Sequence, residues 1–387
     1  MAASPRPYII SSSRGVAMKI VVYAICKNEE QFVERWMQSM SEADQVVVLD
    51  TGSTDNTVQR LRDRGAAVTQ ETIRPWRFDA ARNRSLELTP EDADVCVCTD
   101  LDEVFHPGWR DALERAWTPD ADQAAYRYTW SFNADGSEGV VFWAEKIHTR
   151  TGWRWVHPVH EVLQRTGSPG ARITAAGVQL DHHPDPRKSR GQYLHLLELS
   201  VAEDPADDRN MHYLGREYMY RGRWDDCIAT LRRHLAMPTA VWRDERAASM
   251  RYIARSLAEK GDWRDARDWY LRAIAEAPHL REPYMDLAML LYRREEWEGV
   301  LYFTGCALAI QDRPRTYICE AASWGSLPMD LRAIALYHTG RIPEAAEAAR
   351  EACRLEPSNR RLEGNAALLE RLAQRSAGEE DPPFTGI

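Results

Sequence analysis

The stretch that decides the fold of the first half is Asp94-Val-Cys-Val-Cys-Thr-Asp100-Leu-Asp102-Glu-Val-Phe-His-Pro107. Its apolar run predicts a short buried strand over Val95–Thr99, which delivers Asp100 and Asp102 at its carboxyl end. Two carboxylates one residue apart at a strand end suit a hard divalent cation and the phosphates that it binds. The same Asp-x-Asp tripeptide occurs twice more in the chain, but there no β-branched run directly precedes it. The hypothesis is therefore that Asp100 and Asp102 hold a metal–diphosphate, with Asp102 as the more direct metal ligand.

The sequence upstream of this stretch alternates between strand and helix patterns. Apolar runs of strand length lie at Lys19–Ile25 and Gln45–Leu49, with a weaker one at Ala66–Thr69, and segments with helical spacing of apolar residues separate them. This alternation is typical of a parallel α/β sheet, in which ligands collect at the carboxyl ends of the strands.

Three polar clusters fall at predicted strand ends. They are Asn28/Glu29, Asp50 to Asp55, and Asp100/Asp102. Taken alone, the second cluster also fits a strand–turn–helix connection rich in turn-forming residues, in which Ser53 or Thr54 caps the helix. The coincidence of three clusters favours a ligand pocket in which a carboxylate accepts hydrogen bonds from a base or ribose.

Four motifs carry a resemblance to a known family. Cys26-Lys-Asn-Glu-Glu, Asp50-Thr-Gly-Ser-Thr-Asp, Ala80-Ala-Arg-Asn and Asp100-Leu-Asp-Glu follow one another in the order seen in family 2 glycosyltransferases of the GT-A fold. The resemblance covers roughly residues 18 to 190. It implies a Rossmann-like domain that binds a nucleotide-sugar, usually UDP-linked, a hexosyltransferase type of activity, and a Mn²⁺ or Mg²⁺ ion on the diphosphate.

The same resemblance assigns roles to individual residues. An arginine at the position of Arg82 lies beside the base or diphosphate in the family, where its planar guanidinium can stack or clamp. A histidine near the last strand serves some members as a third metal ligand, and His182 and His183 are both candidates. The implied nucleotide-binding residues are Asn28, Glu29, Asp50, Ser53, Asp55, Arg82, Asp100 and Leu101, and the implied metal ligands are Asp100, Asp102, His182 and His183. Glu103 is assigned to the turn that follows.

An inverting transfer needs a base that takes the proton of the acceptor as it attacks the anomeric carbon. The segment Trp155-Val-His-Pro-Val-His160-Glu161 occupies the matching place in the chain. Glu161 is the first candidate, and His160 is the second candidate or an orienting partner, because the pair departs from the commoner Glu-Asp of the family. The aromatic residues of 126–132 fit either a core stripe or the lining of an acceptor cleft.

The second half has continuous helical periodicity with a repeated turn. Gly222-Arg-Trp recurs as Gly261-Asp-Trp, then in degenerate form as Glu295-Glu-Trp, and again near Gly340. This pattern resembles tetratricopeptide repeats and predicts three to four helical hairpins, interrupted by an irregular stretch over Pro314–Pro328. Stacked helical hairpins form an extended concave surface, which suits peptide binding or a homodimer formed through the repeats. The layout as a whole is similar to that of bacterial peptide glycosyltransferases.

The fold class expected is therefore an α/β GT-A domain followed by an all-α tetratricopeptide-like domain. The predicted boundaries are a disordered leader at 1–17, the GT-A domain at 18–188, the repeats at 189–375 and a flexible tail at 376–387. A length of 387 residues fits two domains, and the net charge of −9 argues against a whole-chain nucleic-acid footprint. Seven cysteines without regular spacing predict reduced core thiols. No apolar run is long enough to span a bilayer, so a cytoplasmic protein is expected.

The function expected is a metal-dependent glycosyltransferase with a nucleotide-sugar donor. A peptide or protein is the first acceptor considered, with a small molecule, a saccharide or a modified DNA base behind it. One alternative is a helical-repeat binding or assembly protein whose transferase domain is inactive. Another is a nucleotidyltransferase, although the sequence has no Gly-rich, Lys-bearing phosphate loop to support it.

Overall fold

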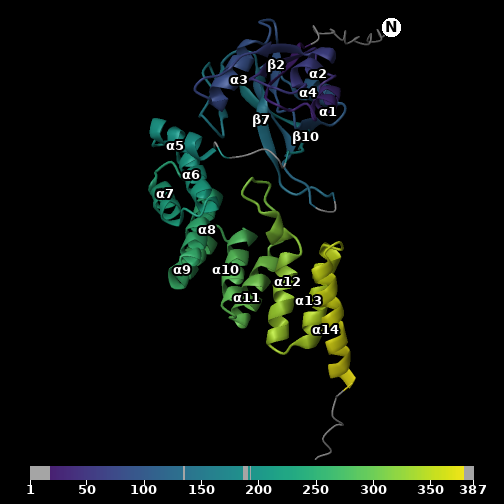
Figure 1. Cartoon of the computed structure of the whole chain (residues 1–387), viewed down its shortest axis with the longest axis vertical. Helices are drawn as coiled ribbons and strands as arrows, with labels where there is room; N and C mark the ends of the chain where they lie inside the picture. The colour runs from purple at the N-terminus through teal and green to yellow at the C-terminus, as the bar shows by residue number, and fades with distance from the viewer. Residues whose placement is uncertain (1–17, 134–135, 186–190, 192, 379–387) are drawn as a thin grey trace, which may run out of the picture.

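The computed structural model describes residues 18–133, 136–185, 191 and 193–378. The predicted leader at 1–17 and the predicted domain boundary at 188–189 lie outside the described residues. A sheet domain occupies one end of the molecule, and a row of helical hairpins extends away from it (Figure 1). The order of elements confirms the predicted α/β domain followed by a helical-repeat domain.

The first domain is built on an eight-stranded mixed sheet in the order β3-β2-β1-β4-β7-β6-β10-β5. The first four of these strands are parallel, as predicted, whereas β7 pairs antiparallel with both β4 and β6. A separate two-stranded ribbon, β8–β9, was not predicted. The elements are β1 (Ile20–Cys26), α1 (Val33–Ser39), β2 (Gln45–Asp50), α2 (Thr57–Asp63), β3 (Ala67–Gln70), α3 (Phe78–Glu87), β4 (Val95–Cys98), β5 (Glu103–Phe105), α4 (Trp109–Ala116), β6 (Ala121–Thr129), β7 (Val141–Thr149), β8 (Trp153–Val156), β9 (Val162–Arg165) and β10 (Ala171–His182).

Strand β1 is buried along its whole length because both faces of the sheet are covered. Ile20, Val22 and Ala24 pack on the side of α1 and α4, whereas Val21 and Tyr23 pack on the side of α3 and β8. Successive side chains of a strand point to opposite faces, so one continuous apolar run supplies both layers of the core.

A buried polar chain crosses this core. The Trp155 indole donates to the Tyr23 hydroxyl at 2.8 Å, and that hydroxyl lies 2.8 Å from His148 Nε2. His148 Nδ1 lies 2.8 Å from the Thr149 carbonyl, which can only accept, so Nδ1 carries the proton and Nε2 accepts from Tyr23. Burial lowers the pKa of His148 to about 4, and the ring is therefore neutral in the folded protein.

The second domain consists of four antiparallel helical hairpins with a lone helix at each end. Apolar residues of successive hairpins form one continuous cluster, which also takes in Val159 from the first domain and packs against Trp76 and Phe78. The helices are α5 (Tyr193–Glu203), α6 (Asp208–Tyr220), α7 (Trp224–Ala236), α8 (Arg243–Glu259), α9 (Trp263–Glu276), α10 (Arg281–Arg293), α11 (Trp297–Ala309), α12 (Leu327–His338), α13 (Ile342–Leu355) and α14 (Arg360–Gly378), with a 3₁₀ turn η1 (Ala321–Trp324) before α12. Helix α14 continues three residues into the segment predicted as tail.

Each hairpin turns through a residue in the left-handed region. Gly222, Gly261 and Gly340 have φ of +69°, +87° and +77°, and Glu295 has +57° at the corresponding position of the third hairpin. Glycine adopts this conformation without a steric cost, whereas other residues pay about 1–2 kcal/mol. The degenerate third copy therefore keeps the geometry of the repeat without its preferred residue.

The irregular stretch expected between α11 and α12 runs over residues 310–326. It lies against the first helices of three successive hairpins, because the Tyr317 hydroxyl donates to Glu245 of α8, the Tyr317 ring lies 5.9 Å from that of Tyr213 on α6, and the Trp324 indole donates to Glu282 of α10 at 3.0 Å. Its Glu320 also accepts from the fully buried Arg251 at 2.8 Å. We call residues 310–326 the crossing loop.

All seven cysteines are free thiols, five of them buried, as predicted from their irregular spacing. No helix in the described part of the chain combines the length and the apolar character that crossing a bilayer requires.

The turn of the third hairpin predicts a stabilising substitution. Replacing Glu295 with glycine removes the left-handed strain but adds freedom to the unfolded chain, which leaves a net gain of ~0.5–1 kcal/mol. Urea unfolding followed by far-ultraviolet circular dichroism measures it. The matched control is Gly261→Ala, which has open space around the added carbon and should lose stability through its φ alone. A destabilised Glu295→Gly variant would contradict the assignment.

The buried ring of His148 predicts a loss of stability in acid. As pH falls from about 6.5 to 4, the unfolded chain binds a proton at this histidine and the folded chain does not, which costs ~3 kcal/mol. Below pH 4 this group adds no further loss. In His148→Gln, stability should fall less steeply over that range, as measured by urea unfolding at several pH values. His195→Gln changes an exposed histidine and should keep the wild-type slope.

Candidate active site

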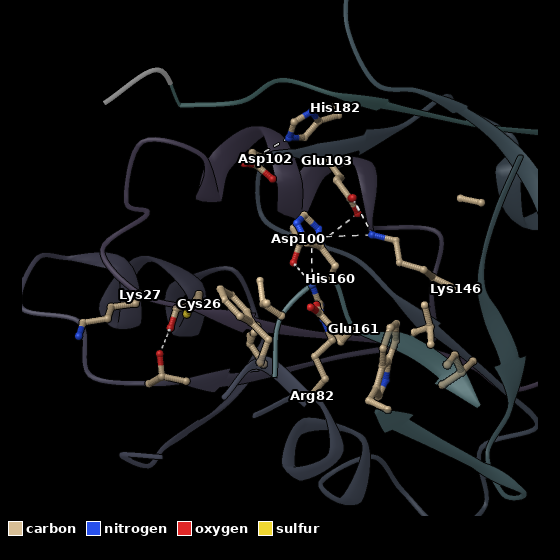
Figure 2. Close-up of a pocket in the computed structure, with 18 of the residues that line it drawn as sticks. Cys26, Lys27, Arg82, Asp100, Asp102, Glu103, Lys146, His160, Glu161 and His182 are labelled. Atoms are coloured by element: carbon tan, nitrogen blue, oxygen red, sulfur yellow. Dashed lines mark hydrogen bonds and ion pairs between the residues drawn. The ribbon is translucent and has the colours of Figure 1, made fainter. Parts of the chain in front are cut away.

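A cavity of about 1000 Å³ opens at the carboxyl ends of β1, β2 and β4 (Figure 2). Its walls include Cys26, Thr51, Asp100 and Asp102 from these strand ends and the loops that follow them. Parallel strands end at one edge of the sheet, so loops distant in sequence meet there. Tyr193 and Arg209 of the helical domain complete the lining.

The loops after β1 and β2 are tied to each other by the predicted nucleoside-binding residues. The backbone nitrogen of Asn28 donates to the Ser53 hydroxyl at 2.8 Å, and Asn28 Oδ1 accepts from the backbone of Thr54 at 2.7 Å. Asp50 is fully buried, and its carboxylate accepts from the backbone nitrogens of its own turn and from Ser53. These contacts shape the loops, and the wall of the cavity at this point comes from their neighbours.

The other predicted residues of this region also either line the cavity or hold the structure around it. Glu29 lines the cavity. Asp55 Oδ1 accepts from the backbone nitrogen of Thr57 at 3.0 Å, at the start of α2, so neither Ser53 nor Thr54 caps this helix as expected. Burial works against the charge of Asp55, but hydrogen bonds from Thr57 lower its pKa. Leu101, between the two aspartates of the predicted metal motif (Asp100 and Asp102), is fully buried in the core.

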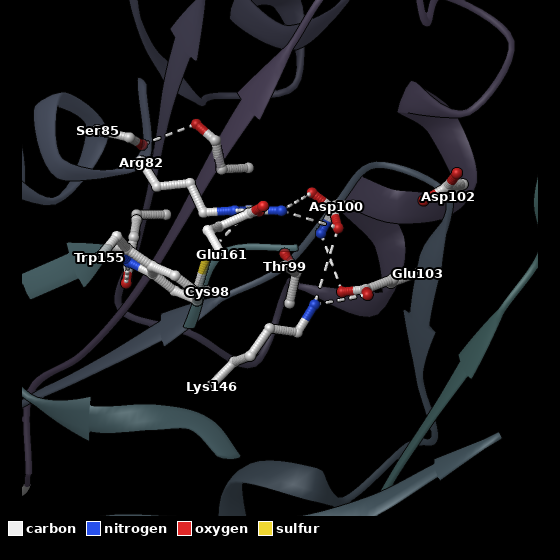
Figure 3. A network of polar contacts seen from close by, with 12 residues as sticks. Arg82, Ser85, Cys98, Thr99, Asp100, Asp102, Glu103, Lys146, Trp155 and Glu161 are labelled. Atoms are coloured by element: carbon white, nitrogen blue, oxygen red, sulfur yellow. Dashed lines mark hydrogen bonds and ion pairs between the residues drawn. The ribbon is translucent and has the colours of Figure 1, made fainter. Parts of the chain in front are cut away.

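Arg82 joins the metal motif to the candidate base (Figure 3). Its Nη2 donates to both carboxylate oxygens of Asp100, at 2.9 and 3.2 Å, and its Nε donates to Glu161. The guanidinium also lies 5.2 Å from the ring of Trp155. Burial opposes its charge, but Asp100 and Glu161 hold the pKa of Arg82 well above its usual value. The residue is a permanent, nearly buried cation between two carboxylates.

A second ion pair, Glu103 with Lys146, lies on the other side of Asp100 (Figure 3). Lys146 Nζ is 2.7 Å from Glu103 and 3.8 Å from Asp100, and the Tyr128 hydroxyl donates to Glu103 at 2.7 Å. Burial raises the pKa of Glu103, and Lys146 opposes that effect. The assignment of Glu103 to a turn was therefore wrong, because it begins β5 and its side chain is buried.

Lys146 was missed in the sequence. The signal was present, because Glu145 and Lys146 interrupt the otherwise apolar run 140–147, and Lys146 lines the cavity together with Phe142 and Ala144. A charged residue on a strand face otherwise occupied by apolar side chains indicates a buried partner.

Asp102 and His182 face each other across the cavity edge, with 3.7 Å between Oδ2 and Nε2 (Figure 2). His182 Nδ1 lies 3.0 Å from the Trp130 carbonyl and therefore carries a proton, and Nε2 is the ring nitrogen that faces Asp102. Burial works against the charged ring, but Asp102 raises the pKa of His182. His183 instead stacks on Phe132, with ring centroids 5.5 Å apart, outside the lining.

Divalent ions in proteins are held by groups of carboxylate, imidazole and thiolate side chains. No group of three or more such ligands converges within the residues that the structure describes. Asp102 and the Nε2 of His182 nevertheless fit Mg²⁺ or Mn²⁺, because these ions commonly take a few protein ligands and complete their shell with water and substrate phosphate. Asp100 lies beside them but is bound by Arg82.

Glu161 and His160 lie in the segment between β8 and β9, and both line the cavity. Glu161 is nearly buried and bound to Arg82, whereas the His160 ring stacks on Tyr213 of α6, with centroids 4.1 Å apart. An aromatic wall formed by Tyr128 and Trp130 also lines the cavity. In it Trp130 is 42% exposed and stacks on His182 at 4.4 Å, while Tyr128 is buried, so the aromatic stripe contributes both to the core and to the cavity.

The Glu103–Lys146 pair predicts a specific coupling. Lys146→Met leaves a buried carboxylate without its cation and should cost about 3 kcal/mol of unfolding free energy. The double variant Lys146→Met/Glu103→Gln should recover most of this loss, because the remaining amide can stay hydrogen-bonded to Tyr128. Urea unfolding of the wild type and the variants measures the coupling. Additive losses in the double variant would show that the two side chains do not depend on each other.

Comparisons with known proteins found one family model and a set of solved structures. Residues 21–167 match the sequence model of the family described as glycosyl transferase family 2. Among solved structures, the chain is similar to that of MamA, with 17% identity, a TM-score of 0.35, and coverage of 42% of this chain and 86% of that chain. Yeast Tom70 gives 13%, 0.38, 49% and 37%, and YrrB, described as a TPR protein with an unusual peptide-binding site, gives 12%, 0.36, 46% and 84%.

Proposed function

We propose that the protein transfers a sugar from a nucleoside diphosphate sugar, UDP-linked, to an acceptor nucleophile, since residues 21–167 match the family 2 glycosyltransferase model. The observation that carries the proposal is the meeting of three pairs in one cavity. Asp102 lies beside His182, Arg82 holds Asp100, and Glu161 reaches the same guanidinium. Together they provide a place for a cation, a fixed positive charge and a candidate base.

The charges of the cavity support a metal-dependent reaction. Seven acidic side chains and five basic ones line it, and the basic Arg82 and Lys146 are already paired. A diphosphate placed there alone would face net negative charge. The acidic residues are Glu29, Asp100, Asp102, Glu103, Glu145, Glu161 and Asp185, and the basic residues are Lys27, Arg74, Arg82, Lys146 and Arg209. When bound by Asp102 and His182, Mn²⁺ or Mg²⁺ would supply the charge that offsets the departing diphosphate.

The proposed transfer is a single displacement at the anomeric carbon of the donor sugar. The acceptor attacks the anomeric carbon on the face opposite the diphosphate, and the bond from that carbon to the phosphate oxygen breaks. The electron pair of the broken bond leaves with the nucleoside diphosphate. The proton of the acceptor passes to the Glu161 carboxylate, which Arg82 holds in place, and the product is inverted at the anomeric carbon. His160 is the alternative base.

The acceptor proposed first is a peptide or protein. The supporting features are the exposed Trp130 in the cavity wall and the continuation of the lining onto Tyr193 and Arg209 of the repeat domain. An exposed aromatic ring offers a stacking surface for an extended chain or a sugar. A saccharide, a small molecule and a modified DNA base are the alternatives that an acceptor screen separates.

The proposal predicts a metal-linked loss in Asp102→Ala. A panel of nucleotide-sugars is screened with Mn²⁺ or Mg²⁺ for hydrolysis and for a rise in melting temperature, since a ligand that binds only the folded state must raise it. The variant should lose roughly 100-fold or more in turnover, together with the stabilisation by UDP and Mn²⁺.

Asp92→Ala is the matched control, since it changes an aspartate of the same tripeptide pattern on the exposed surface. It should behave as the wild type. Full turnover in Asp102→Ala with metal chelated would contradict the proposal.

A further inference from the structure

The segment that carries Glu161 has an unfavourable backbone. His157 and His160 both lie in the left-handed region, with φ of +77° and +51°, and neither is glycine. Each such residue costs about 1–2 kcal/mol, so the conformation persists only where surrounding contacts hold it. The contacts that hold this segment therefore decide where Glu161 points.

Three of these contacts come from helix α6 of the repeat domain and its N-cap. Asp207, the N-cap of α6, has a carboxylate oxygen 3.2 Å from His157 Nδ1. Arg209 donates to the His160 carbonyl at 2.9 Å, and the Tyr213 ring stacks on the His160 ring with an interplanar angle of 23°. Figure 1 shows α5 and α6 at the end of the helical row that lies nearest the sheet domain.

The apolar contacts point the same way. Val159, between the two strained residues, is 2% exposed and belongs to the core cluster of the repeats rather than to the core of the sheet domain. The repeat domain thus holds His157, Val159 and His160, while the sheet domain holds Pro158 through the backbone nitrogen of Phe78 at 2.9 Å and Glu161 through Arg82.

Tyr213 is itself fixed on its other sides. The guanidinium of Arg216 lies 4.5 Å from its ring, and Tyr317 of the crossing loop lies 5.9 Å away. Only 5% of Tyr213 is exposed. A buried ring held by a cation and a second ring is a rigid support for the histidine that stacks on it.

We propose that Tyr213, with Asp207 and Arg209, is a positioning residue of the active site, and that the repeat domain thereby sets the pose of His160 and Glu161. The inference rests on the proposed function for the role of Glu161, but not for the clamp itself. The repeat domain is then a structural part of the catalytic unit, in addition to any surface that it offers to an acceptor.

The test compares three variants of helix α6. Tyr213→Leu removes the stacking ring, Tyr213→Phe keeps it, and Tyr218→Leu removes an equally buried ring whose hydroxyl donates to Glu198 away from the segment. Turnover and donor KM are measured for the full-length protein, and hydrogen exchange of the amides of residues 157–163 is followed by mass spectrometry.

Tyr213→Leu should lose ~10–100-fold in kcat, because small misplacements of a reacting group have effects of that size, while the donor KM changes less than about twofold. Its 157–163 amides should exchange at least ~10-fold faster, since the strained backbone is released. Tyr213→Phe should restore both properties, and Tyr218→Leu should match the wild type.

Equal exchange in Tyr213→Leu and Tyr218→Leu would overturn the inference. If the wild type turns over no nucleotide-sugar, the proposed function fails, and the exchange measurement still decides whether the clamp exists. Asp207→Asn serves as a second variant should Tyr213→Leu not fold, because asparagine remains a good N-cap but cannot form an ion pair with His157. It should also speed exchange, and an unchanged rate there would count against the clamp.

Discussion

The buried guanidinium of Arg82 is the contact on which the site depends. A cation removed from water is tolerated only where carboxylates surround it, so helix α3, the end of β4 and the loop before β9 are fixed in one mutual arrangement by a single side chain. Since that side chain binds both Asp100 and Glu161, the sides of the cavity that we propose for donor and acceptor share one cation. A change at Asp100 therefore alters the electrostatic environment of Glu161, and a change at Glu161 alters that of Asp100.

The sequence predicted the elements whose signals are local. Strands β1, β2 and β4 are continuous apolar runs, and the hairpins repeat a similar turn motif, so both can be recognised from short stretches of sequence. The pairing of β7 with β4 and the β8–β9 ribbon could not be predicted in the same way, because the partner of a strand is not determined by its own residues alone. The pairing of Glu103 with Lys146 likewise joins positions 43 residues apart.

The candidate site shows the same division. That polar clusters meet at one edge follows from parallel strands alone, but which oxygens face the cavity depends on details of each turn. The Asp50 carboxylate accepts hydrogen bonds from its own loop, whereas the neighbouring Thr51 lines the cavity. His182 and His183 were indistinguishable in sequence because the choice lies in register. Neighbouring residues at a strand end point to opposite sides, and the pairing of His182 with Glu103 turns that ring toward Asp102.

The crossing loop gives the break in the repeat period a physical meaning. Arg251 is wholly enclosed between hairpins, and its charge is shared by Asp286 from the repeats and Glu320 from the loop. The crossing loop thus supplies a counter-ion, Glu320, to an arginine inside the repeats. Trimming the chain to a regular repeat would therefore make it more uniform in sequence and leave an arginine half-neutralised in the interior. At this point of the repeat domain a more regular sequence would be a less stable one. A consensus repeat would lack the crossing loop and therefore the second carboxylate that neutralises Arg251.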